Sequence, residues 1–267
     1  MLVHDVYRRE AKAIAAAAIA LLICCASSRA AGEDSEPSVT PYRPTVSNPA
    51  DLPVPGWLEA EFGGLRVLGD DRSRSDSAPW LLKYAFDEDH GLLLGGNAYV
   101  SAQTPGAPAQ SGLGDTFLEW KQRFPVTDKA AFGIEAGVVA PTAGRNLGIG
   151  KPQWLINGIF SDDLGALHLD LNLGEAHGGD QPAQVSPWQT AWAAAISAAL
   201  PGEWGAAFEL SGTHQRGTPA QSQALFALSY NVSHRLSLDA GTAYGLAHAA
   251  RGRSLFAGAT VLLGRLR

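Results

Sequence analysis

Cysteine is scarce in this chain. Among 267 residues only Cys24 and Cys25 carry a thiol, and both lie in an amino-terminal stretch that we expect to be removed after export. The mature chain then has no disulfide, no thiol nucleophile and no cysteine-bound metal. An exported chain without disulfides needs another source of stability, and a β-sheet that closes on itself supplies one through its hydrogen-bond ladder.

The amino-terminal stretch, residues 1–30, has the order of a secretory signal peptide. Three basic residues precede the apolar run 13–26, and Ser28 and Ala30 place small side chains at the −3 and −1 positions of a cleavage site. The apolar run, at about 14 residues, is short for a membrane-spanning helix. A lipoprotein anchor is the alternative, but neither cysteine follows the small residue that lipidation favours.

Positive charge is also in short supply. The full chain has 20 basic and 26 acidic side chains, and removal of residues 1–30 takes away four of the basic and two of the acidic ones, which leaves a net charge of about −8. Such a surface repels nucleic acid, so we expect no nucleic-acid partner. Only 17% of the residues are charged and the mean hydropathy is −0.03, as in a barrel that alternates lipid-facing and lumen-facing side chains.

Long hydrophobic runs are absent after residue 30, so no membrane-spanning helix is predicted there. Residues 31–55 are rich in proline, serine and aspartate and show no apolar period, which indicates an extended periplasmic lead-in or a plug for a lumen. Residues 56–267 instead contain one period-2 segment after another. We predict twelve strands, at roughly 56–67, 80–86, 91–103, 112–124, 130–141, 151–160, 166–176, 189–200, 205–213, 221–230, 236–247 and 254–264.

The alternation is sharpest in residues 166–174, where leucines at the odd positions oppose polar or small residues at the even ones. In residues 112–124, Leu118 and Trp120 fall on one face, and Glu119 falls on the other. Successive side chains of a strand point to opposite sides of its sheet, so each segment has one apolar and one polar face. A water-soluble β-sandwich would show the same alternation.

The lengths of the connections distinguish a membrane barrel from a sandwich. Tight turns follow every second predicted strand, at 87–90, 125–129, 161–165, 201–204 and 231–235. The other connections are mostly longer and polar, at 68–79, 104–111, 142–150, 177–188, 214–220 and 248–253. Short periplasmic turns and longer outer loops are typical of outer-membrane barrels.

Aromatic residues mark both edges of the predicted apolar band. Those before tight turns are Phe86, Phe124, Phe160 and Tyr230, and those toward the opposite rim are Trp154, Trp192 and Tyr244. Two such girdles are expected of a transmembrane barrel. We therefore predict an all-β, antiparallel, up-and-down barrel of twelve strands in the bacterial outer membrane, with ten or fourteen strands as alternatives. Its expected partners are outer-membrane lipid and the barrel-assembly machinery.

Two sequence segments resemble a known family. Residues 42–50 (YRPTVSNPA) and the following 55–64 (PGWLEAEFGG) are similar to the outer-membrane family named after the meta-pathway of phenol degradation, as are 112–116 (GLGDT) and 254–258 (SLFAG). The resemblance extends over about residues 42–262. It implies a transporter-like barrel for small solutes, aromatic ones among them, and it supplies no established binding residues.

The carboxyl terminus departs from such barrels. They commonly end on an aromatic residue that the assembly machinery recognises, whereas this chain ends in Leu266-Arg267. Recognition for insertion is then either weaker or dependent on Leu263, which falls in the lipid-facing phase.

No arrangement of catalytic residues stands out, and we predict that the protein is not an enzyme. A phospholipase-type barrel needs a serine nucleophile with a histidine base on the lipid side, and an omptin-type protease pairs carboxylates with histidine near the outer rim. Here His168 and Asp170 share a lumen-facing strand, while Asp162 and Asp163 occupy a tight turn at the opposite end.

Neither a cofactor nor a metal is predicted. Residues 144–151 (GRNLGIGK) depart from a phosphate-binding loop in spacing, and Pro152 stands where serine or threonine is needed. His177, His214 and His248 fall in predicted outer loops, where a metal would be possible but solvated side chains are expected.

The polar faces of the strands supply the candidate lumen-lining residues: Glu59, Glu61, Lys83, Asp115, Glu119, Lys121, Arg123, Glu135, Asp170, Glu209 and Asp239. Buried charges need partners or water. They form either an ion-pair network that holds the barrel rigid or the lining of a narrow wet path that disfavours anions. We predict a passive channel for small solutes, and the alternative is a non-conducting structural or ligand-binding barrel that acts through its outer loops.

Overall fold

The computed structural model describes residues 36–144, 147–247 and 251–266, and every regular element in these ranges is a β-strand. The expected signal peptide, residues 1–30, and His248 lie outside these ranges. In the described part of the chain no helix has the length and hydropathy needed to cross a membrane. The strands are β1 (Trp57–Gly69), β2 (Arg74–Ala85), β3 (His90–Gln103), β4 (Gln110–Gly112), β5 (Thr116–Pro125), β6 (Ala130–Ala140), β7 (Gln153–Leu164), β8 (Leu167–Gly178), β9 (Trp188–Ala199), β10 (Trp204–Gln215), β11 (Gln221–Ser233), β12 (Leu236–Gly245) and β13 (Gly252–Arg265).

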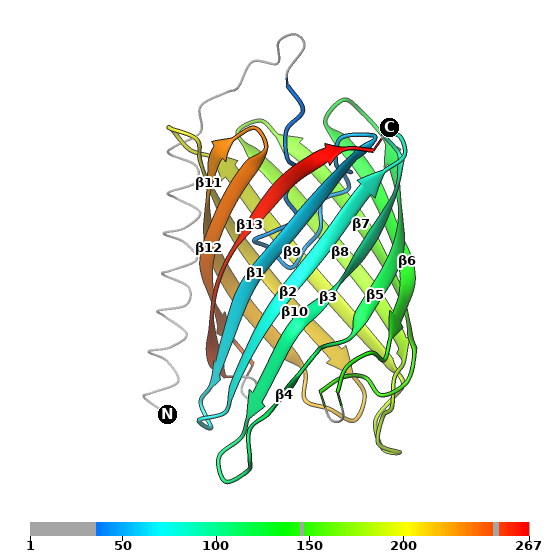
Figure 1. The fold of residues 1–267 in the computed structure, drawn as a ribbon, viewed down its shortest axis with the longest axis vertical. Coiled ribbons are helices and arrows are strands. Elements are labelled where there is room, and N and C mark those ends of the chain that lie inside the picture. The colour runs from blue at the N-terminus through cyan, green and yellow to red at the C-terminus, as the bar shows by residue number, and fades with distance from the viewer. Residues whose placement is uncertain (1–35, 145–146, 248–250, 267) are drawn as a thin grey trace.

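The strands form one closed antiparallel barrel (Figure 1). Each strand pairs with its neighbours along the chain, and β1 pairs with β13 to complete the ring. The short β4 and the longer β5 both pair with β3, β4 near its carboxyl end and β5 near its amino end, so together they make one interrupted strand of the wall. The predicted fold class, an up-and-down barrel of twelve strands, is confirmed.

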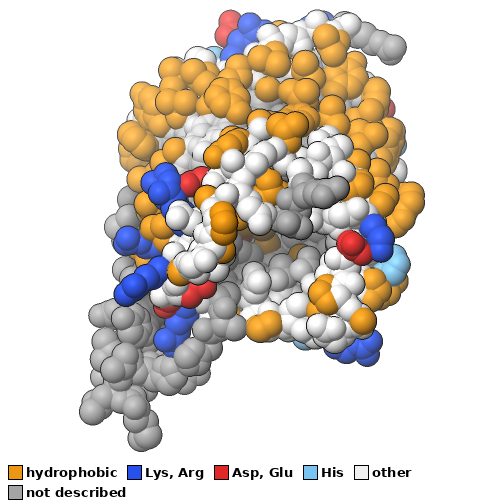
Figure 2. Space-filling model, turned by 60° about the horizontal axis from the view of Figure 1, so that its bottom comes forward, with side chains coloured by type: hydrophobic (Ala, Val, Ile, Leu, Met, Phe, Trp, Pro, Cys, Tyr) orange, Lys and Arg blue, Asp and Glu red, His pale blue; other side chains and the backbone are white. Residues whose placement is uncertain are grey.

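The outside of the barrel is apolar. On β5 the side chains of Leu118 and Trp120 are 48% and 42% exposed, whereas Lys121, which points inward, is fully buried. Hydrophobic side chains cover the flank of the molecule in Figure 2, which looks toward the loop end. A continuous apolar surface of this extent is unfavourable in water, whereas acyl chains solvate it well.

Aromatic rings on neighbouring strands contact one another near the end that carries the tight turns. Ring centroids lie 5.8 Å apart for Phe86 and Trp120, and 5.1 Å apart for Phe132 and Phe160. Trp204 and Tyr230 form a third pair, at 4.9 Å. Amphipathic and aromatic rings are favoured at the level of the lipid headgroups.

The two ends of the barrel differ in their connections. The tight turns, at 86–89, 126–129, 165–166, 200–203 and 234–235, all lie at the end where the carboxyl terminus lies, at the top of Figure 1. Most connections at the opposite end are longer, as predicted. The predicted outer loop 68–79 is wrong, because β1 and β2 continue as a hairpin and leave only residues 70–73 between them.

A cross-strand ion pair contributes to the extended hairpin. Asp76 on β2 accepts hydrogen bonds from Arg66 on β1, at 2.6 Å, and from Arg74 on its own strand, at 2.7 Å. The first residues of β2, 74–77, are polar on both faces, so they lack the alternation from which the other strands are predicted. The predicted strand 112–124 is likewise interrupted, at residues 113–115.

Residues 36–55 run inside the barrel, and we call this segment the plug. In Figure 1 it enters from the end with the tight turns, passes into the lumen and returns to the start of β1. Tyr42, Ser47 and Ala50 of the plug are buried. Inward-facing glycines make room for it, since a Cβ on Gly133 would lie 3.3 Å from the Cα of Ala50.

Candidate functional site

Carboxylates of the barrel wall bind the plug through its backbone. Glu61 on β1 accepts hydrogen bonds from the N–H groups of Tyr42, at 2.7 Å, and Arg43, at 3.2 Å. Glu209 on β10 accepts bonds from the N–H groups of Val46 and Ser47, both at 2.8 Å. A proline-rich segment cannot pair its own backbone in a helix or sheet, so its buried N–H groups need partners from the wall.

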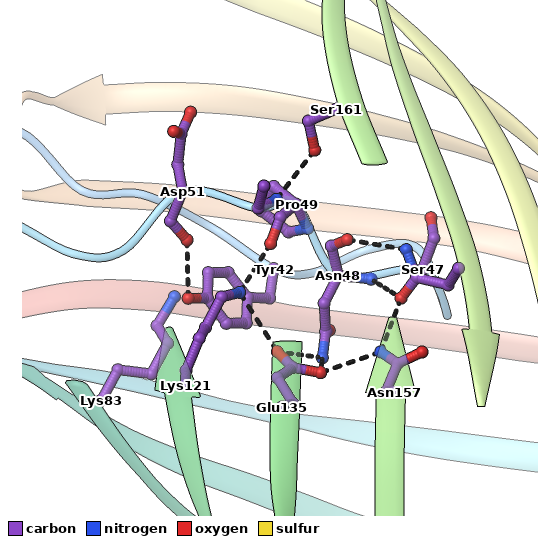
Figure 3. Close-up of polar contacts among 12 residues, drawn as sticks. Tyr42, Ser47, Asn48, Pro49, Asp51, Lys83, Lys121, Glu135, Asn157 and Ser161 are labelled. Atoms are coloured by element: carbon purple, nitrogen blue, oxygen red, sulfur yellow. Dashed lines mark hydrogen bonds and ion pairs between the residues drawn. The ribbon is translucent and has the colours of Figure 1, made fainter. Parts of the chain in front are cut away.

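An amide cluster binds the middle of the plug (Figure 3). The side chain of Asn48 donates to both carboxylate oxygens of Glu135, at 3.0 Å each. Its backbone N–H donates to the side chain of Asn172 at 3.0 Å, and the Asn172 amide donates back to the carbonyl of Asn48 at 2.8 Å. Asn157 completes the cluster by donating to Glu135 at 2.9 Å. This reciprocal pairing fixes the position of residue 48 along the lumen.

Two fully buried lysines lie over the ring of Tyr42. The ammonium nitrogen of Lys83 is 3.8 Å from the ring centroid, and that of Lys121 is 4.0 Å from it. Such cation–π contacts strengthen when water is excluded. The Tyr42 hydroxyl donates to the carbonyl of Asp51 at 2.8 Å. Burial, followed by the nearby carboxylates, raises the pKa of Tyr42 above its ordinary value, so the hydroxyl remains a donor.

Each buried lysine also has carboxylate and carbonyl partners. Lys83 contacts Glu59 at 2.6 Å and Glu61 at 2.5 Å, and it donates to the carbonyl of Thr40 at 2.6 Å. Lys121 contacts Glu135 at 3.1 Å and donates to the carbonyl of Pro49 at 2.6 Å. A buried ammonium group is tolerated only with such partners. Both lysines therefore link the wall to the plug.

Two ion pairs connect arginines and aspartates of plug and wall. Arg43 of the plug makes two 3.0 Å hydrogen bonds to Asp239 on β12. Arg123 on β5 donates to Asp51 of the plug at 2.8 Å, in a more exposed position. The first pair is a two-point contact, the geometry in which guanidinium–carboxylate interactions are strongest.

A chain of polar groups lies near the end that carries the tight turns. The N–H of Ala50 donates to the Ser161 hydroxyl at 2.8 Å, and this hydroxyl donates to Asp170 at 2.5 Å. His168 lies between Asp170, at 3.1 Å, and Asp163, at 2.6 Å. The serine hydroxyl is directed at a carboxylate rather than at a histidine base, which differs from the nucleophile–base contact of hydrolases.

The eleven candidate lumen-lining residues occupy four kinds of position. Those that contact the plug directly are Glu59, Glu61, Lys83, Lys121, Arg123, Glu135, Glu209 and Asp239. Asp170 reaches the plug through Ser161. Asp115 accepts bonds from the N–H groups of Ala143, at 3.0 Å, and Ile149, at 2.7 Å, and so positions an outer loop. Glu119 lies on the inner face of β5, between the inward positions 117 and 121.

Sequence reasoning missed the neutral members of the site. Asn157, Asn172 and Ser161 all bind the plug or its carboxylate partners. Asn157 and Asn172 lie on the polar faces of predicted strands, and that position was the available signal, whereas Ser161 falls in the predicted tight turn 161–165 and lies on β7 in the structure. Uncharged polar residues are common on any wet surface, so their type did not mark them.

The predicted loop positions of His177 and His214 are wrong, because these residues lie near the ends of β8 and β10. His177 packs against Trp188, with ring centroids 4.3 Å apart. His214 lies on β10, paired in register with Thr190. In the described residues no group of three or more histidine, cysteine, aspartate or glutamate side chains is arranged to hold a metal ion.

Two cavities flank the plug inside the barrel. We call the one beside the long loops the outer cavity and the one beside the tight turns the inner cavity. The outer cavity has a volume of about 570 Å³, and the residues around it include Val46, Val100, Phe117, Val139, Leu147 and Ile149. The inner one has a volume of about 550 Å³, and its lining includes Pro41, Asp51, His168, Asp170 and Trp204. More than half of the residues that line the outer cavity are apolar, and its polar members are Arg43, Thr45, Glu61, Asn97 and Asp115, whereas the inner cavity is mixed.

No protein-family model matches this sequence, and neither does any curated protein. Solved structures do match. An outer membrane channel from Pseudomonas putida F1 shares 13% identity, with 87% of this chain and 100% of that chain covered and a TM-score of 0.63. The KdgM porin shares 10% identity over 77% of this chain and 99% of its own, with a TM-score of 0.55. The NanC porin shares 9% identity over 77% of this chain and 100% of its own, also with a TM-score of 0.55. At these identities the likeness concerns the fold, and the chain folds as an outer-membrane β-barrel.

Proposed function

We propose that this protein is a passive channel of the bacterial outer membrane for small solutes. The observation that carries the proposal is the unfilled lumen, in which one cavity lies on each side of the plug. A barrel of this size lies between small barrels filled by side chains and wide porins. The similar solved structures named above as a channel and porins support the same function.

The outer cavity supports weakly polar solutes, aromatic ones among them. Its apolar lining, which includes Val100, Phe117 and Val139, would favour a flat hydrophobic molecule over a sugar. We further propose that the chain is a member of the outer-membrane family named after the meta-pathway of phenol degradation, on the sequence segments given above. The solute preference can be tested by comparing uptake of a small phenol with uptake of a sugar of similar mass in liposomes.

Charge on the inner wall supports discrimination against anions. Of the eleven candidate lumen-lining residues, eight are acidic and three are basic. In the present structure several of these carboxylates are satisfied by N–H groups of the plug. Any solute that passes them meets an excess of negative charge, which disfavours anions in a narrow pore.

A non-conducting barrel is the second candidate function. It is favoured by the density of bonds between the plug and the wall, which include two buried lysines and a two-point arginine–aspartate pair. In that case the outer loops would carry a binding role, and the interior would serve stability alone.

Planar-bilayer recording separates the two functions. The mature chain is compared with a variant that lacks residues 36–55, and both are first shown to migrate as folded, heat-modifiable barrels. A channel predicts higher conductance for the deletion variant, with a reversal potential in a KCl gradient that indicates preference for cations. A deletion variant that remains sealed at all voltages would refute the channel and leave the structural barrel.

We also propose that the barrel has no enzymatic role. The support is the direction of the Ser161 hydroxyl, which donates to Asp170 and so lacks a histidine base. Lipase and protease assays with the purified barrel test this, and turnover that disappears in Ser161→Ala or His168→Ala would contradict it.

A further inference from the structure

The outer and inner cavities share two lining residues of the plug. Arg43 and Thr45 line both cavities, whereas the residues on the far sides of each cavity differ. The boundary between the cavities therefore lies beside the plug, against the wall that faces Arg43. This wall is formed by β12, β13 and β1, where Asp239 pairs in register with Gly258, and Gly258 pairs with Gly63.

Two of the wall residues that face Arg43, Gly63 and Gly258, have no side chain. A Cβ on Gly63 would lie 2.9 Å from the Arg43 guanidinium carbon, and a Cβ on Gly258 would lie 2.5 Å from the Arg43 Nε. The guanidinium thus occupies the space that two wall side chains would otherwise fill. It is held there by Asp239, whose side chain is 5% exposed.

The Arg43 contact differs in kind from most of the other attachments. Glu61 and Glu209 hold backbone N–H groups of the plug, so these contacts break only if the chain itself moves. The Arg43 guanidinium is the end of a flexible side chain, and rotamer changes of a side chain are fast compared with displacement of a segment. Rotation of Arg43 would open the boundary while the plug stays bound.

We infer that the Arg43–Asp239 ion pair is the selectivity-determining constriction of a solute path that runs beside the bound plug and joins the two cavities. The inference rests on the proposed channel function and adds its route. A path through the constriction meets both charges of the pair. Removal of Arg43 leaves the Asp239 carboxylate alone, and removal of Asp239 leaves the guanidinium alone, so the two changes should shift ion selectivity in opposite directions.

The Arg66–Asp76 pair of the β1–β2 hairpin provides a control. It also joins an arginine and an aspartate of different segments, at 2.6 Å. Neither residue lines the inner or the outer cavity. Its removal should leave the boundary between the cavities unchanged.

The experiment keeps the plug in place by a disulfide. The chain without residues 1–30 has no cysteine, so Ala50→Cys with Gly133→Cys introduces a single pair. A Cβ on Gly133 would lie 3.4 Å from that of Ala50, close to the separation of about 3.8 Å found in disulfides. In this locked barrel, Arg43→Ala, Asp239→Ala and Arg66→Ala are compared by planar-bilayer conductance and by reversal potential in a KCl gradient.

We expect R43A to raise conductance in the locked barrel and to shift the reversal potential toward cation preference. D239A should shift it toward anions, and R66A should leave both quantities unchanged. The inference would be overturned if R43A conducted no better than the locked barrel that keeps Arg43, while the variant lacking residues 36–55 conducted. The channel function would then still stand. A sealed deletion variant would instead refute the channel itself.

The sign of the shift in reversal potential distinguishes a constriction from an ion pair that only stabilises the plug. If R43A and D239A shift the reversal potential in the same direction, or not at all, the ion pair only stabilises the plug and the inference is wrong. If the disulfide fails to form, as judged by gel mobility with and without reductant, the same two shifts measured in the unlocked barrel decide the question.

Discussion

Lys83 is a fully buried charge that depends on its ion-pair partners. It has no exposed surface, and it satisfies Glu59 and Glu61 while lying over the ring of Tyr42. Charges in such a place persist because each is paired, and a carboxylate left without its partner is strongly destabilising. The lysine therefore serves the wall and the plug at once.

We predict that Lys83→Met lowers the free energy of unfolding of the barrel by about 3–5 kcal/mol, because two buried carboxylates lose their cation. Lys129→Met is the control, since Lys129 is exposed in a tight turn. Denaturant unfolding in detergent micelles, followed by gel mobility, measures both variants. Equal unfolding midpoints for K83M and the unmutated barrel would contradict the assigned pairing.

Glu209 tests the backbone attachments of the plug. One of its carboxylate oxygens accepts bonds from the Val46 and Ser47 N–H groups and from the Ser47 hydroxyl. Glu209→Ala orphans these donors, at about 1–3 kcal/mol for each buried group, whereas Glu209→Gln keeps an oxygen acceptor. We expect protease cleavage within residues 36–55 to be faster in E209A than in E209Q. Equal cleavage rates would show that the attachment does not hold the plug.

Among the elements, the strands that cross the apolar band were the most predictable. Lipid outside and polar groups inside impose a period of two, and β8 shows it because its leucines face outward and Asp170 and Asn172 face the plug. The β1–β2 hairpin was not predicted to its full length. The first residues of β2, 74–77, are polar on both faces, and the Arg66–Asp76 ion pair joins them to β1 without any alternation.

The break between β4 and β5 was also not predicted. Asp115 was assigned to a continuous strand by its alternation alone. In the structure its carboxylate binds two N–H groups of an outer loop, and this long-range demand interrupts the ladder. Contacts between segments distant in sequence leave no local pattern, which is why the break could not be anticipated.

The tight turn between β2 and β3 has an acid-sensitive hydrogen bond. Asp87 accepts bonds from the N–H groups of Asp89, at 2.9 Å, and His90, at 2.8 Å. The Asp89 backbone bond, then the His90 side chain, lowers the pKa of Asp87 below its usual 3.8. Its folded pKa lies below the unfolded one, so its stabilisation is present above the unfolded pKa and is lost as the pH falls through the folded value.

We therefore predict that the Asp89 and His90 amides keep their protection from hydrogen exchange at neutral pH and lose it in acid. The loss should begin as the pH drops below the unfolded pKa of Asp87. Asp87→Asn should reduce the pH dependence while retaining an oxygen acceptor. Protection in the unmutated turn that does not change with acid would disprove the proposed role of the carboxylate.

At the scale of the whole molecule, closure followed from the sequence on general grounds. Strand edges cannot remain unpaired in hydrocarbon, so twelve alternating segments had to form a ring, and the β1–β13 pairing forms it. The position of residues 31–55 did not follow. The plug is bound mainly through its backbone N–H groups, and its partners Glu61, Glu135 and Glu209 are scattered along the chain. Neither the backbone attachment nor the position of these partners leaves a pattern in the sequence of the plug.

The account depends most on the outside of the barrel facing acyl chains and the inside facing water. The mature chain lacks cysteine, so nitroxide labels can be placed singly along β8. In lipid vesicles, labels at Leu171→Cys and Leu173→Cys should collide mainly with dissolved oxygen, and labels at Gly174→Cys and Ala176→Cys mainly with a water-soluble nickel chelate. The account predicts this alternation. Greater access of the chelate to positions 171 and 173, as on a water-soluble sheet, would contradict it.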